Sequence, residues 1–337
     1  MSWYNKAAAE DDVVVSSRIR LARNINGYPF PSRLSDEGFE KVKNLVKEAI
    51  IESNTPFSKN LKYIEMSDIP ENLRYSMVER HLISPEFVSD CKNKAIIISE
   101  DESICIMLGE EDHIRIQVLM PGLDLEKAYD EAQRIDSLLC SSLDIAFDRD
   151  LGFLTECPTN LGTGLRASLM LHLPLLEAGN EISALSDNIG KIGFTVRGMY
   201  GEGTGSGASL YQISNEVTLG ITEKNAIDNL KLIAMQLVTK ERTALNNANM
   251  IKLQDISHRA LAALKSARVL SSEELMEQIS KIKIGVCAKE INLKNEFLTA
   301  LLFENQPYSL MCKFGDMSPE ARDIKRAENV RKALENI

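Results

Sequence analysis

Residues that build metal sites and disulfide frameworks are scarce in this sequence. It has four histidines and six cysteines among 337 residues, and the histidines are scattered, which argues against a zinc site. The cysteines form no CxxC pair and show no metal-binding spacing. They stand at positions 91, 105, 140, 157, 287 and 312. We therefore expect neither a zinc site nor a disulfide framework, but reduced thiols of the kind found in cytoplasmic proteins.

Long apolar runs and a leader sequence are also missing. No apolar stretch approaches the roughly 20 residues of a membrane helix, and the N-terminus "MSWYNKAAAEDD" has no basic start followed by an apolar core. We therefore expect a cytoplasmic protein with no membrane partner. The net charge of −10 argues against direct binding to nucleic acid. An acidic body suits cationic partners, although a solvated acidic surface is the commoner reason for such a charge.

Familiar nucleotide-binding motifs are absent as well. The sequence has no GxxxxGK[ST] phosphate loop, and it lacks the HRD and DFG motifs of protein kinases in the required order. The alternate glycines of "VRGMYGEGTGSGAS" (196–209) invite the interpretation of a phosphate cradle, yet this stretch carries a lone carboxylate, Glu202. A phosphate site in this chain would therefore be of another kind.

Apolar periodicity predicts an α+β protein in two parts. Helical spacing predicts helices over 36–53, from 124 onward and over 222–245. Strands are predicted over 12–24, 95–100, 103–109, 113–120, 153–155, 191–198 and 211–220. The short turn between the segments 95–100 and 103–109 predicts a hairpin, so we expect a sheet that is at least partly antiparallel. Beyond residue 250 only amphipathic helices follow, so we expect an α+β domain over 1–245 and an all-α domain over 250–337.

Five arginines stand in strand or turn contexts rather than on helix surfaces: Arg18, Arg20, Arg115, Arg166 and Arg197. Arg18 and Arg20 have i, i+2 spacing, which puts both on one face of a strand. For any one of these arginines a solvated basic edge is the favoured interpretation. Five of them in polar or glycine-rich segments favour a polyphosphate clamp, because guanidinium forks match phosphate oxygens.

Two carboxylates and one cysteine are candidates for the chemistry. The segment "GEEDH" (109–113) is most simply a charged turn, but it also places a carboxylate beside Arg115. Glu202 is a second candidate. Cys157 opens "CPTNLGTG", and a cysteine near arginines at a helix N-terminus has a lowered thiol pKa. A buried, inert cysteine is the commoner fate in general.

These segments together resemble the phosphagen (guanidino) kinase family. "SSRIRLARN", "EEDHIRIQ", "CPTNLGTGLRAS" and "VRGMYGEGT" occur in that family's order. The resemblance implies a mostly antiparallel sheet flanked by helices. Within the family the chain is most similar to the bacterial protein-arginine kinases of the McsB type. The first strand signal begins near residue 13, without the family's N-terminal helical domain; the loop reads "GEGTGSG"; and "RDIKRA" (322–327) stands in the helical part.

The resemblance assigns roles to individual residues. The residues that would contact ATP are Ser17, Arg18, Arg20, His81, Arg115, Arg166 and Arg197. Magnesium would be held mainly by ATP rather than by protein side chains. Glu111 and Glu202 would hold the substrate guanidinium, with Glu111 as the base, Glu202 mainly positioning, and Cys157 beside them tuning the charge. Met170 stands where many relatives have a histidine near the adenosine, which leaves the nucleotide affinity open.

In the helical part, Arg322, Asp323 and Arg326 would form a phosphoarginine pocket. Without the resemblance, a solvated charged helix end is the simpler interpretation of that segment.

The implied function is an ATP-dependent protein-arginine kinase that marks proteins for Clp-type proteolysis and controls stress responses. Its expected partners are protein substrates with exposed arginines, an activator protein, a Clp chaperone or protease, and a second copy of the chain bound through the helical domain. Two alternatives stay open. One is a kinase of a free guanidino metabolite, and the other is a phosphoarginine-binding regulatory adaptor. The intact set of arginines and glutamates argues against an adaptor that has lost catalysis.

Overall fold

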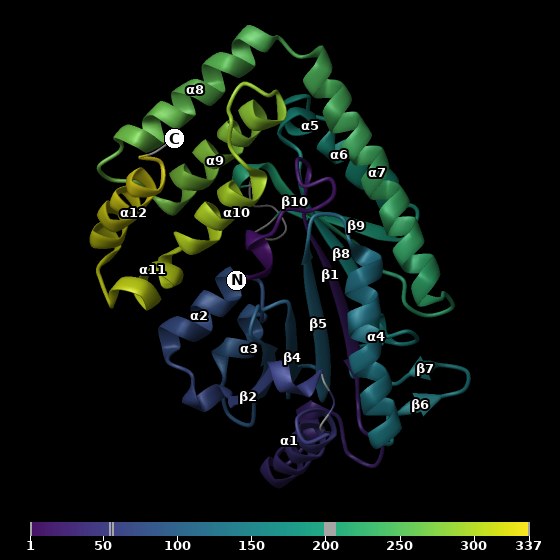
Figure 1. Cartoon of the computed structure of the whole chain (residues 1–337). Coiled ribbons are helices and arrows are strands. Elements are labelled where there is room, and N and C mark those ends of the chain that lie inside the picture. The colour runs from purple at the N-terminus through teal and green to yellow at the C-terminus, as the bar shows by residue number, and fades with distance from the viewer. Residues whose placement is uncertain (1, 54, 56, 199–206, 336–337) are drawn as a thin grey trace.

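The computed structural model describes residues 2–53, 55, 57–198 and 207–335. Its centre is an eight-stranded sheet with the order β2-β3-β4-β5-β1-β8-β10-β9, in which the paired neighbours run antiparallel (Figure 1). The strands are β1 (Val14–Arg23), β2 (Leu61–Glu65), β3 (Ala95–Ser99), β4 (Ile104–Leu108), β5 (Ile114–Pro121), β8 (Leu165–His172), β9 (Phe194–Gly198) and β10 (Leu210–Asn215). The prediction of an α+β fold with a mostly antiparallel sheet is confirmed.

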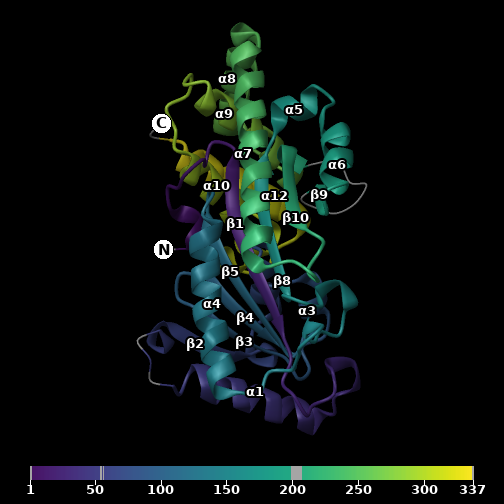
Figure 2. The same ribbon diagram turned by 90° about the vertical axis from the view of Figure 1, so that its right-hand side faces the viewer.

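One face of the sheet is covered by long helices. These are α1 (Asp36–Ile50), α4 (Leu125–Ser142) and α7 (Glu223–Asn247), and Figure 2 shows α4 and α7 lying across the strands. Ser35 Oγ accepts from Gly38 N at 3.1 Å and so caps α1. Ile19 and Leu21 of β1 are buried in the core on this side. Because side chains alternate along a strand, Arg18 and Arg20 must face the other way.

The opposite face is covered in two separate places. Over β3–β5, the helices α2 (Glu71–Glu79) and α3 (Pro85–Ser89) pack with Trp3 and Phe303 on a cluster that includes Met107 and Leu119. Over β8 and β10, the C-terminal helices pack on Leu210 and Met170. The arginine-bearing stretch of β1 lies between these two coverings.

The C-terminal helices share a hydrophobic core with the sheet. They are α8 (Met250–Ser266), α9 (Ser272–Cys287), α10 (Asn295–Glu304), α11 (Pro307–Phe314) and α12 (Pro319–Ala333). Leu210 of β10 belongs to the same buried cluster as Ile279 and Leu302 of these helices. Removing the helices would therefore expose part of the sheet to water. No described helix is long and apolar enough to cross a membrane.

The strand predicted over 153–155 is shorter and lies outside the main sheet. The chain forms β7 (Gly152–Phe153), which pairs with β6 (Phe147–Asp148) in a separate hairpin that projects beside α4 (Figure 1). Two further short helices, α5 (Pro174–Ala178) and α6 (Ile182–Gly190), follow β8. The chain leaves this hairpin at Phe153 and leads directly into the segment that carries Cys157.

Candidate active site

Neighbouring strands bring the predicted arginines together. Arg20 of β1 lies directly opposite Arg166 of β8 in the antiparallel register. On the other side of β1, Arg115 of β5 lies opposite Ala22, two residues along from Arg20 and on the same face. Arg197 of β9 lies opposite Gln212 of β10. Residues far apart in the sequence thus share one face of the sheet.

All five arginines line one cavity of about 540 Å³. Its other wall comes from Glu79, the last residue of α2, and from the segment that joins α2 to α3, including His81 and Ser84. Gln306, between α10 and α11, closes one side. Arginines on the sheet therefore form the base of the cavity. The α2–α3 region and the C-terminal helices, which cover this face of the sheet, enclose it.

Three of the arginines in this cavity are only partly satisfied by the described part of the chain, whereas Arg115 pairs with Glu110 and Glu111. Arg18 donates from Nε to Ser168 Oγ at 3.1 Å and from Nη2 to Gln212 Oε1 at 2.6 Å, both neutral acceptors. The Nε atoms of Arg20 and Arg166 are buried without a hydrogen-bond partner. A buried unpaired donor is costly, so these groups fit a multiply charged anion.

Burial and mutual repulsion lower the pKa values of these guanidinium groups. Burial, with Arg166 and Arg115 nearby, lowers the pKa of Arg18 to about 10. Burial and the same kind of neighbours hold the pKa of Arg20 well below its ordinary value. The pKa of Arg166 is lowered by burial and by Arg197. A polyphosphate would relieve this repulsion, which is what an ATP site requires.

His81 is the non-arginine group of the predicted nucleotide set that the structure brings to this cavity. Its backbone lies in the left-handed region at φ +61°, and Gln117 Nε2 donates to its carbonyl oxygen at 2.9 Å. Its Nε2 is buried without a partner. Burial and the charge of Arg18 lower the pKa of His81 to about 4. A neutral imidazole therefore faces the cavity at neutral pH.

A second, smaller cavity of about 200 Å³ adjoins the first. It shares Arg20, Arg115 and Arg166 with the larger cavity and adds Glu111 and Cys157. The predicted base and the predicted cysteine therefore lie beside the three cations that would hold the phosphate nearest the reaction. The structure thus joins an anion-binding cavity to a cavity that carries a carboxylate and a thiol.

Glu111 is oriented by two neighbours. Its Oε2 accepts from Arg115 Nη2 at 2.9 Å and from Asn160 Nδ2 at 3.3 Å. Cys157 Sγ lies 3.0 Å from Thr159 Oγ1, within hydrogen-bond distance. The helix expected after Cys157 is a single 3₁₀ turn, Pro158–Asn160. Asn160 was not among the predicted site residues. Its place in the segment "CPTN" was the one sequence feature that could have indicated it.

The buried carboxylate of Asp112 joins the segments that form two sides of this smaller cavity. Asp112 Oδ1 accepts from Asn24 Nδ2 at 2.7 Å and from Glu156 N at 2.9 Å. Asn24 Oδ1 in turn accepts from His113 N at 2.8 Å. The turn that carries Glu111, the loop that carries Cys157 and the end of β1 are therefore fastened at one point. Burial raises the pKa of Asp112.

Ser17 does not join the nucleotide set, and its predicted role is corrected. Its hydroxyl is fully buried on the opposite face of β1, where it donates to Gly122 O at 2.8 Å and accepts from Asp124 N at 2.9 Å. Strand alternation puts Ser16, not Ser17, on the face of Arg18 and Arg20. The period-two pattern alone could have identified Ser16.

Glu110 is a site residue that sequence analysis missed. It forms an ion pair with Arg115 Nη1 and accepts from Ser84 Oγ at 2.5 Å. It thereby links Arg115 of β5 to Ser84 at the start of α3, and both of these residues line the larger cavity. Two adjacent glutamates in "GEEDH" thus have different surroundings. The residue pattern alone did not tell them apart, whereas the family resemblance singled out Glu111.

Glu202, the remaining predicted carboxylate, lies outside the described residues. Met170 lies opposite Ser16 and Gln212 on the arginine face of the sheet. Its side chain packs against the core of the C-terminal helices. Its relation to an adenosine stays a prediction.

The predicted docking residues lie on α12, far from the cavities along the chain. Arg326 is 1% exposed and donates from Nε to Asn305 O and from Nη1 to Leu270 O, both at 2.8 Å. It also pairs with Asp323. In this structure Arg326 therefore ties the C-terminal helices together, while Arg322 is half-buried. Docking of phosphoarginine on these three residues stays a prediction.

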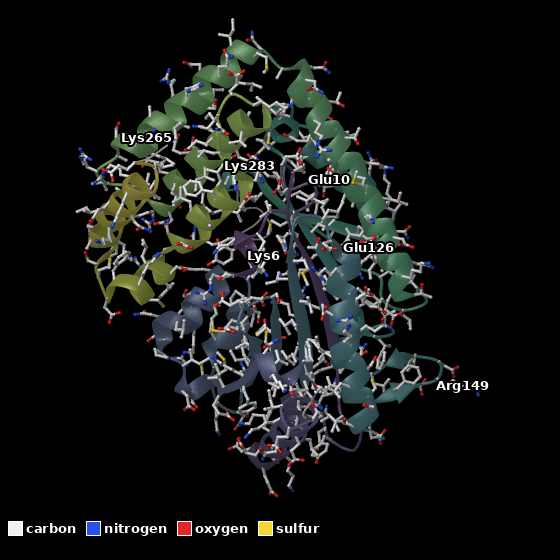
Figure 3. All side chains as sticks on the ribbon, in the orientation of Figure 1. Lys6, Glu10, Glu126, Arg149, Lys265 and Lys283 are labelled. Atoms are coloured by element: carbon white, nitrogen blue, oxygen red, sulfur yellow. The ribbon has the colours of Figure 1, made fainter. Side chains whose placement is uncertain are left out.

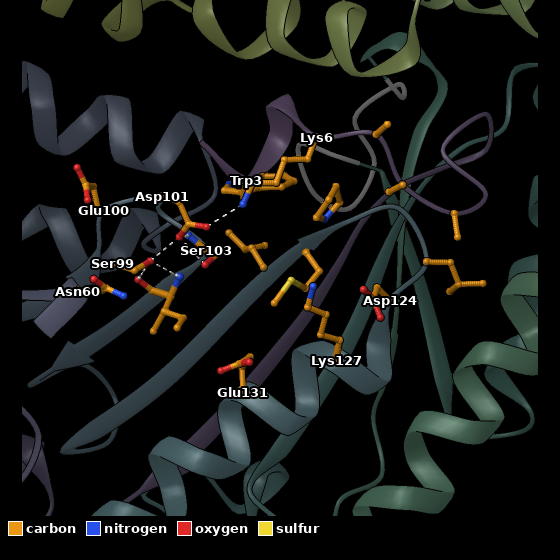
Figure 4. Close-up of a pocket in the computed structure, with 18 of the residues that line it drawn as sticks. Trp3, Lys6, Asn60, Ser99, Glu100, Asp101, Ser103, Asp124, Lys127 and Glu131 are labelled. Carbon is orange, nitrogen blue, oxygen red and sulfur yellow. Dashed lines mark hydrogen bonds and ion pairs between the residues drawn. The ribbon is translucent and has the colours of Figure 1, made fainter. Parts of the chain in front are cut away.

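A larger cavity in the described part of the chain, of about 760 Å³, is elsewhere (Figure 4). It lies between the N-terminal segment and α4, where Lys6 pairs with Asp101 and where Lys127 and Glu131 line the side of α4. None of the predicted site residues lines it. Within the described ranges, no group of three His, Cys, Asp or Glu side chains could hold a metal ion. We therefore identify the arginine cavity as the candidate site by the charged groups that line it and not by its volume.

The two joined cavities suit phosphoryl transfer to a cation. Arginines would hold a polyphosphate and neutralise charge that develops on the transferred group. A carboxylate beside them would orient a guanidinium and accept the proton that its attacking nitrogen loses. A guanidinium needs both forms of help, because it is protonated and delocalised at neutral pH.

Comparison with known proteins points to the same chemistry. The family model "ATP:guanido phosphotransferase, C-terminal catalytic domain" matches residues 41–244, and "Protein-arginine kinase McsB C-terminal domain" matches residues 250–337. The chain is 41% identical to a protein-arginine kinase of Desulforamulus reducens, over 99% of this chain and 96% of that protein. It is 42% identical to a protein-arginine kinase of Halothermothrix orenii, over 98% of this chain and 96% of that protein.

Solved structures share the fold at lower identity. The crystal structure of a lombricine kinase matches with a TM-score of 0.62 and 21% identity, covering 73% of this chain and 72% of that chain. At this identity the similarity shows a common architecture.

Proposed function

The chain belongs to the ATP:guanido phosphotransferase family and, within it, to the protein-arginine kinases, and from this premise we propose that it transfers the γ-phosphoryl group of ATP to the guanidinium of arginine residues in proteins. The attacking guanidinium nitrogen forms the new P–N bond, ADP leaves, and Glu111 takes the proton. Arg18, Arg20, Arg115, Arg166, Arg197 and His81 bind the nucleotide.

One observation carries this proposal. Arg20, Arg115 and Arg166 form a wall common to both cavities, with Glu111 and Cys157 on the far side of it. The γ-phosphate of ATP, held by these arginines, then lies between the rest of the nucleotide and the carboxylate of Glu111. This is the arrangement that in-line transfer to a positively charged acceptor needs.

We further propose the finer features that the family resemblance implies. Magnesium would accompany ATP, held mainly by the nucleotide, and would neutralise part of the charge on its phosphates. Glu202 and Cys157 help to hold the guanidinium. The phosphoarginine product marks proteins for Clp-type proteolysis in stress responses, with an activator protein as partner. The protein acts in the cytoplasm as a homodimer through its helical part, and Arg322, Asp323 and Arg326 help to dock phosphoarginine.

Incubation of the purified chain with ATP, magnesium and an arginine-rich protein tests the activity. Mass spectrometry under neutral-to-basic handling should then find acid-labile phosphoarginine on the substrate, and at least about 10²-fold less of it at equal times with a Glu111→Gln variant. Removal of magnesium with EDTA should abolish the product. If free arginine is phosphorylated while protein arginine is not, the chain is a kinase of a guanidino metabolite and the proposal fails.

A further inference from the structure

Helix α2 ends in a turn that holds His81 in a left-handed conformation. Leu82 N donates to Met77 O, and His81 N donates to Val78 O, both at 2.9 Å. These two hydrogen bonds form a Schellman motif, in which the residue at the position of His81 has a positive φ and is usually glycine. The φ of His81 is +61°. Because a side chain makes this conformation unfavourable, glycine would suit the turn better than histidine.

The imidazole of His81 is also incompletely satisfied by the protein. It lines the arginine cavity, and its Nε2 is buried without a hydrogen-bond partner in the described part of the chain. A buried polar atom of this kind lowers the stability of the protein. The stability of the fold therefore does not account for a histidine at this turn. Backbone strain combined with an unpaired polar group is typical of a functional position.

Gln117 of β5 holds the backbone of this turn. It lies opposite Arg20 in the register of β5 with β1, and it is 3% exposed. Its Nε2 donates to His81 O at 2.9 Å and to Leu82 O at 2.8 Å. A side-chain amide nitrogen carries two hydrogens, and both are used on the turn. Although Gln117 lines the arginine cavity, its two donors are thus directed at the turn and not at a ligand.

Phe303 of α10 holds the ring of His81. The two rings pack edge to face, with centroids 5.5 Å apart and an interplanar angle of 88°. Phe303 is itself 3% exposed, and its ring centroid lies 5.7 Å from that of Trp3 and 5.2 Å from that of Tyr4. This N-terminal segment, marked by Lys6 in Figure 3, lies between the α2–α3 region and the C-terminal helices (Figure 1). The cluster therefore restricts the ring of Phe303, which in turn restricts the imidazole.

We propose that Gln117 and Phe303 are positioning residues: Gln117 fixes the backbone of His81, Phe303 fixes its ring, and together they direct the imidazole at the nucleotide held by the arginines. This inference rests on the proposed function, in which His81 binds the nucleotide, and it adds two residues that act through His81. An interaction made equally in the bound state and in the transition state lowers KM without raising kcat. Both residues therefore contribute to nucleotide affinity.

Isothermal titration of the purified chain with magnesium and ADP tests this proposal. Gln117→Leu removes both donors from the turn, so the dissociation constant for ADP should rise about 5- to 30-fold. Phe303→Leu keeps an apolar side chain but releases the imidazole, and the constant should rise about 3- to 10-fold. In kinase assays the KM for ATP should rise in the same proportion, while kcat changes by less than about 3-fold.

A second background shows whether both residues act through His81. His81→Gly suits the left-handed turn but removes the imidazole, so it should weaken ADP binding by at least about 5-fold. When Gln117→Leu or Phe303→Leu is added to His81→Gly, the dissociation constant should change by less than about 2-fold. Circular dichroism verifies that each variant folds, and either residue can be tested if the variant of the other does not fold.

The matched control is Ser17→Ala, which removes two buried hydrogen bonds on the opposite face of β1. It should lower the melting temperature and leave ADP binding unchanged. If Ser17→Ala weakened ADP binding as much as Gln117→Leu does, the effect would come from a general loss of stability, and the positioning role would be overturned.

The failures of the two proposals are distinguishable. Unchanged ADP binding in a folded variant overturns the role of that residue, and equal weakening with and without the His81 imidazole overturns the role of both. Normal ADP binding by His81→Gly also overturns the proposal, because the imidazole then does not contact the nucleotide. If ADP binding follows our expectation but no phosphoarginine forms on a protein substrate, the positioning role stands and the proposed kinase activity fails.

Discussion

Arg20 and Arg166 lie directly opposite each other on β1 and β8, and the Nε atom of each is buried without a hydrogen-bond partner. Two like charges in this position destabilise the protein alone. A bound polyphosphate would satisfy both groups, and Glu111 lines the adjoining cavity, where we propose that the acceptor guanidinium binds.

Replacing Arg20 with methionine should separate stability from activity. The variant loses a partly buried cation repelled by its neighbours, so its melting temperature without nucleotide should rise, by the equivalent of about 1 kcal/mol or more. Phosphoryl transfer should fall by at least about 10³-fold. Differential scanning fluorimetry with and without ADP, together with a kinase assay, measures both effects.

The matched control for this experiment is Arg259→Met on α8, where the arginine side chain is 79% exposed. It should change neither the melting temperature nor the rate. If Arg20→Met were less stable than the wild type without nucleotide, the arginine would be held by the protein itself and the argument from repulsion would be wrong.

The two adjacent glutamates of the 109–113 turn should give different kinetic defects. Glu111→Gln removes the proposed base, so kcat should fall by about 10²–10⁴-fold. Glu110→Gln breaks the contacts to Arg115 and Ser84, so the KM for ATP should rise with a smaller change in kcat. Initial rates over a grid of ATP and protein-substrate concentrations distinguish these outcomes. Equal loss of kcat in both variants would contradict the assignment of Glu111 as the base.

His81 should make stability depend on pH. Its pKa in the folded protein is about 4, below the value near 6.5 of an unfolded chain. The unfolded chain therefore binds a proton first, and stability present above about pH 6.5 is lost as the pH falls toward 4.

Urea unfolding at pH 7 and pH 5 measures this loss. His81→Asn should reduce the difference in unfolding free energy between the two pH values by about 1–2 kcal/mol; asparagine suits the left-handed backbone at this position. His258→Asn, at an exposed position on α8, is the control and should leave the difference unchanged. An unaltered pH dependence in His81→Asn would show that burial of His81 is not its source.

Arg322 and Arg326 should have separable roles although both belong to the "RDIKRA" motif. Arg326→Ala leaves the carbonyls of Asn305 and Leu270 and the carboxylate of Asp323 without their buried donor, so the free energy of unfolding should fall by about 2–4 kcal/mol. Arg322→Ala should change it by less than about 0.5 kcal/mol and weaken phosphoarginine binding. Urea unfolding and isothermal titration with phosphoarginine test this pair. Normal stability in Arg326→Ala would leave docking as its sole role.

Local patterns predicted the main strands and the long helices because each depends on the spacing of neighbouring residues. The alternation of Ile19 and Leu21 with Arg18 and Arg20 already separated the core face of β1 from its charged face. The assignment of Ser17 ignored that alternation, and this explains the error. The small β6–β7 hairpin was harder to predict, because its strands are two residues long and their partner is a loop.

By itself the sequence determined the family, the α+β fold class and the arginines that could hold a polyphosphate, since these follow from motifs and from periodicity along the chain. Tertiary structure decided which side chains meet. The register of β1 with β5 and β8 places Arg20 beside Arg166 and Arg115. The network around Asp112 places Glu111 across from Cys157. The packing of Gly162 between Gly152 and Thr218 fixes the loop that carries Cys157. These relationships join residues that are distant in sequence, and hydrogen bonding and burial between strands and loops fix them, which no local pattern can express.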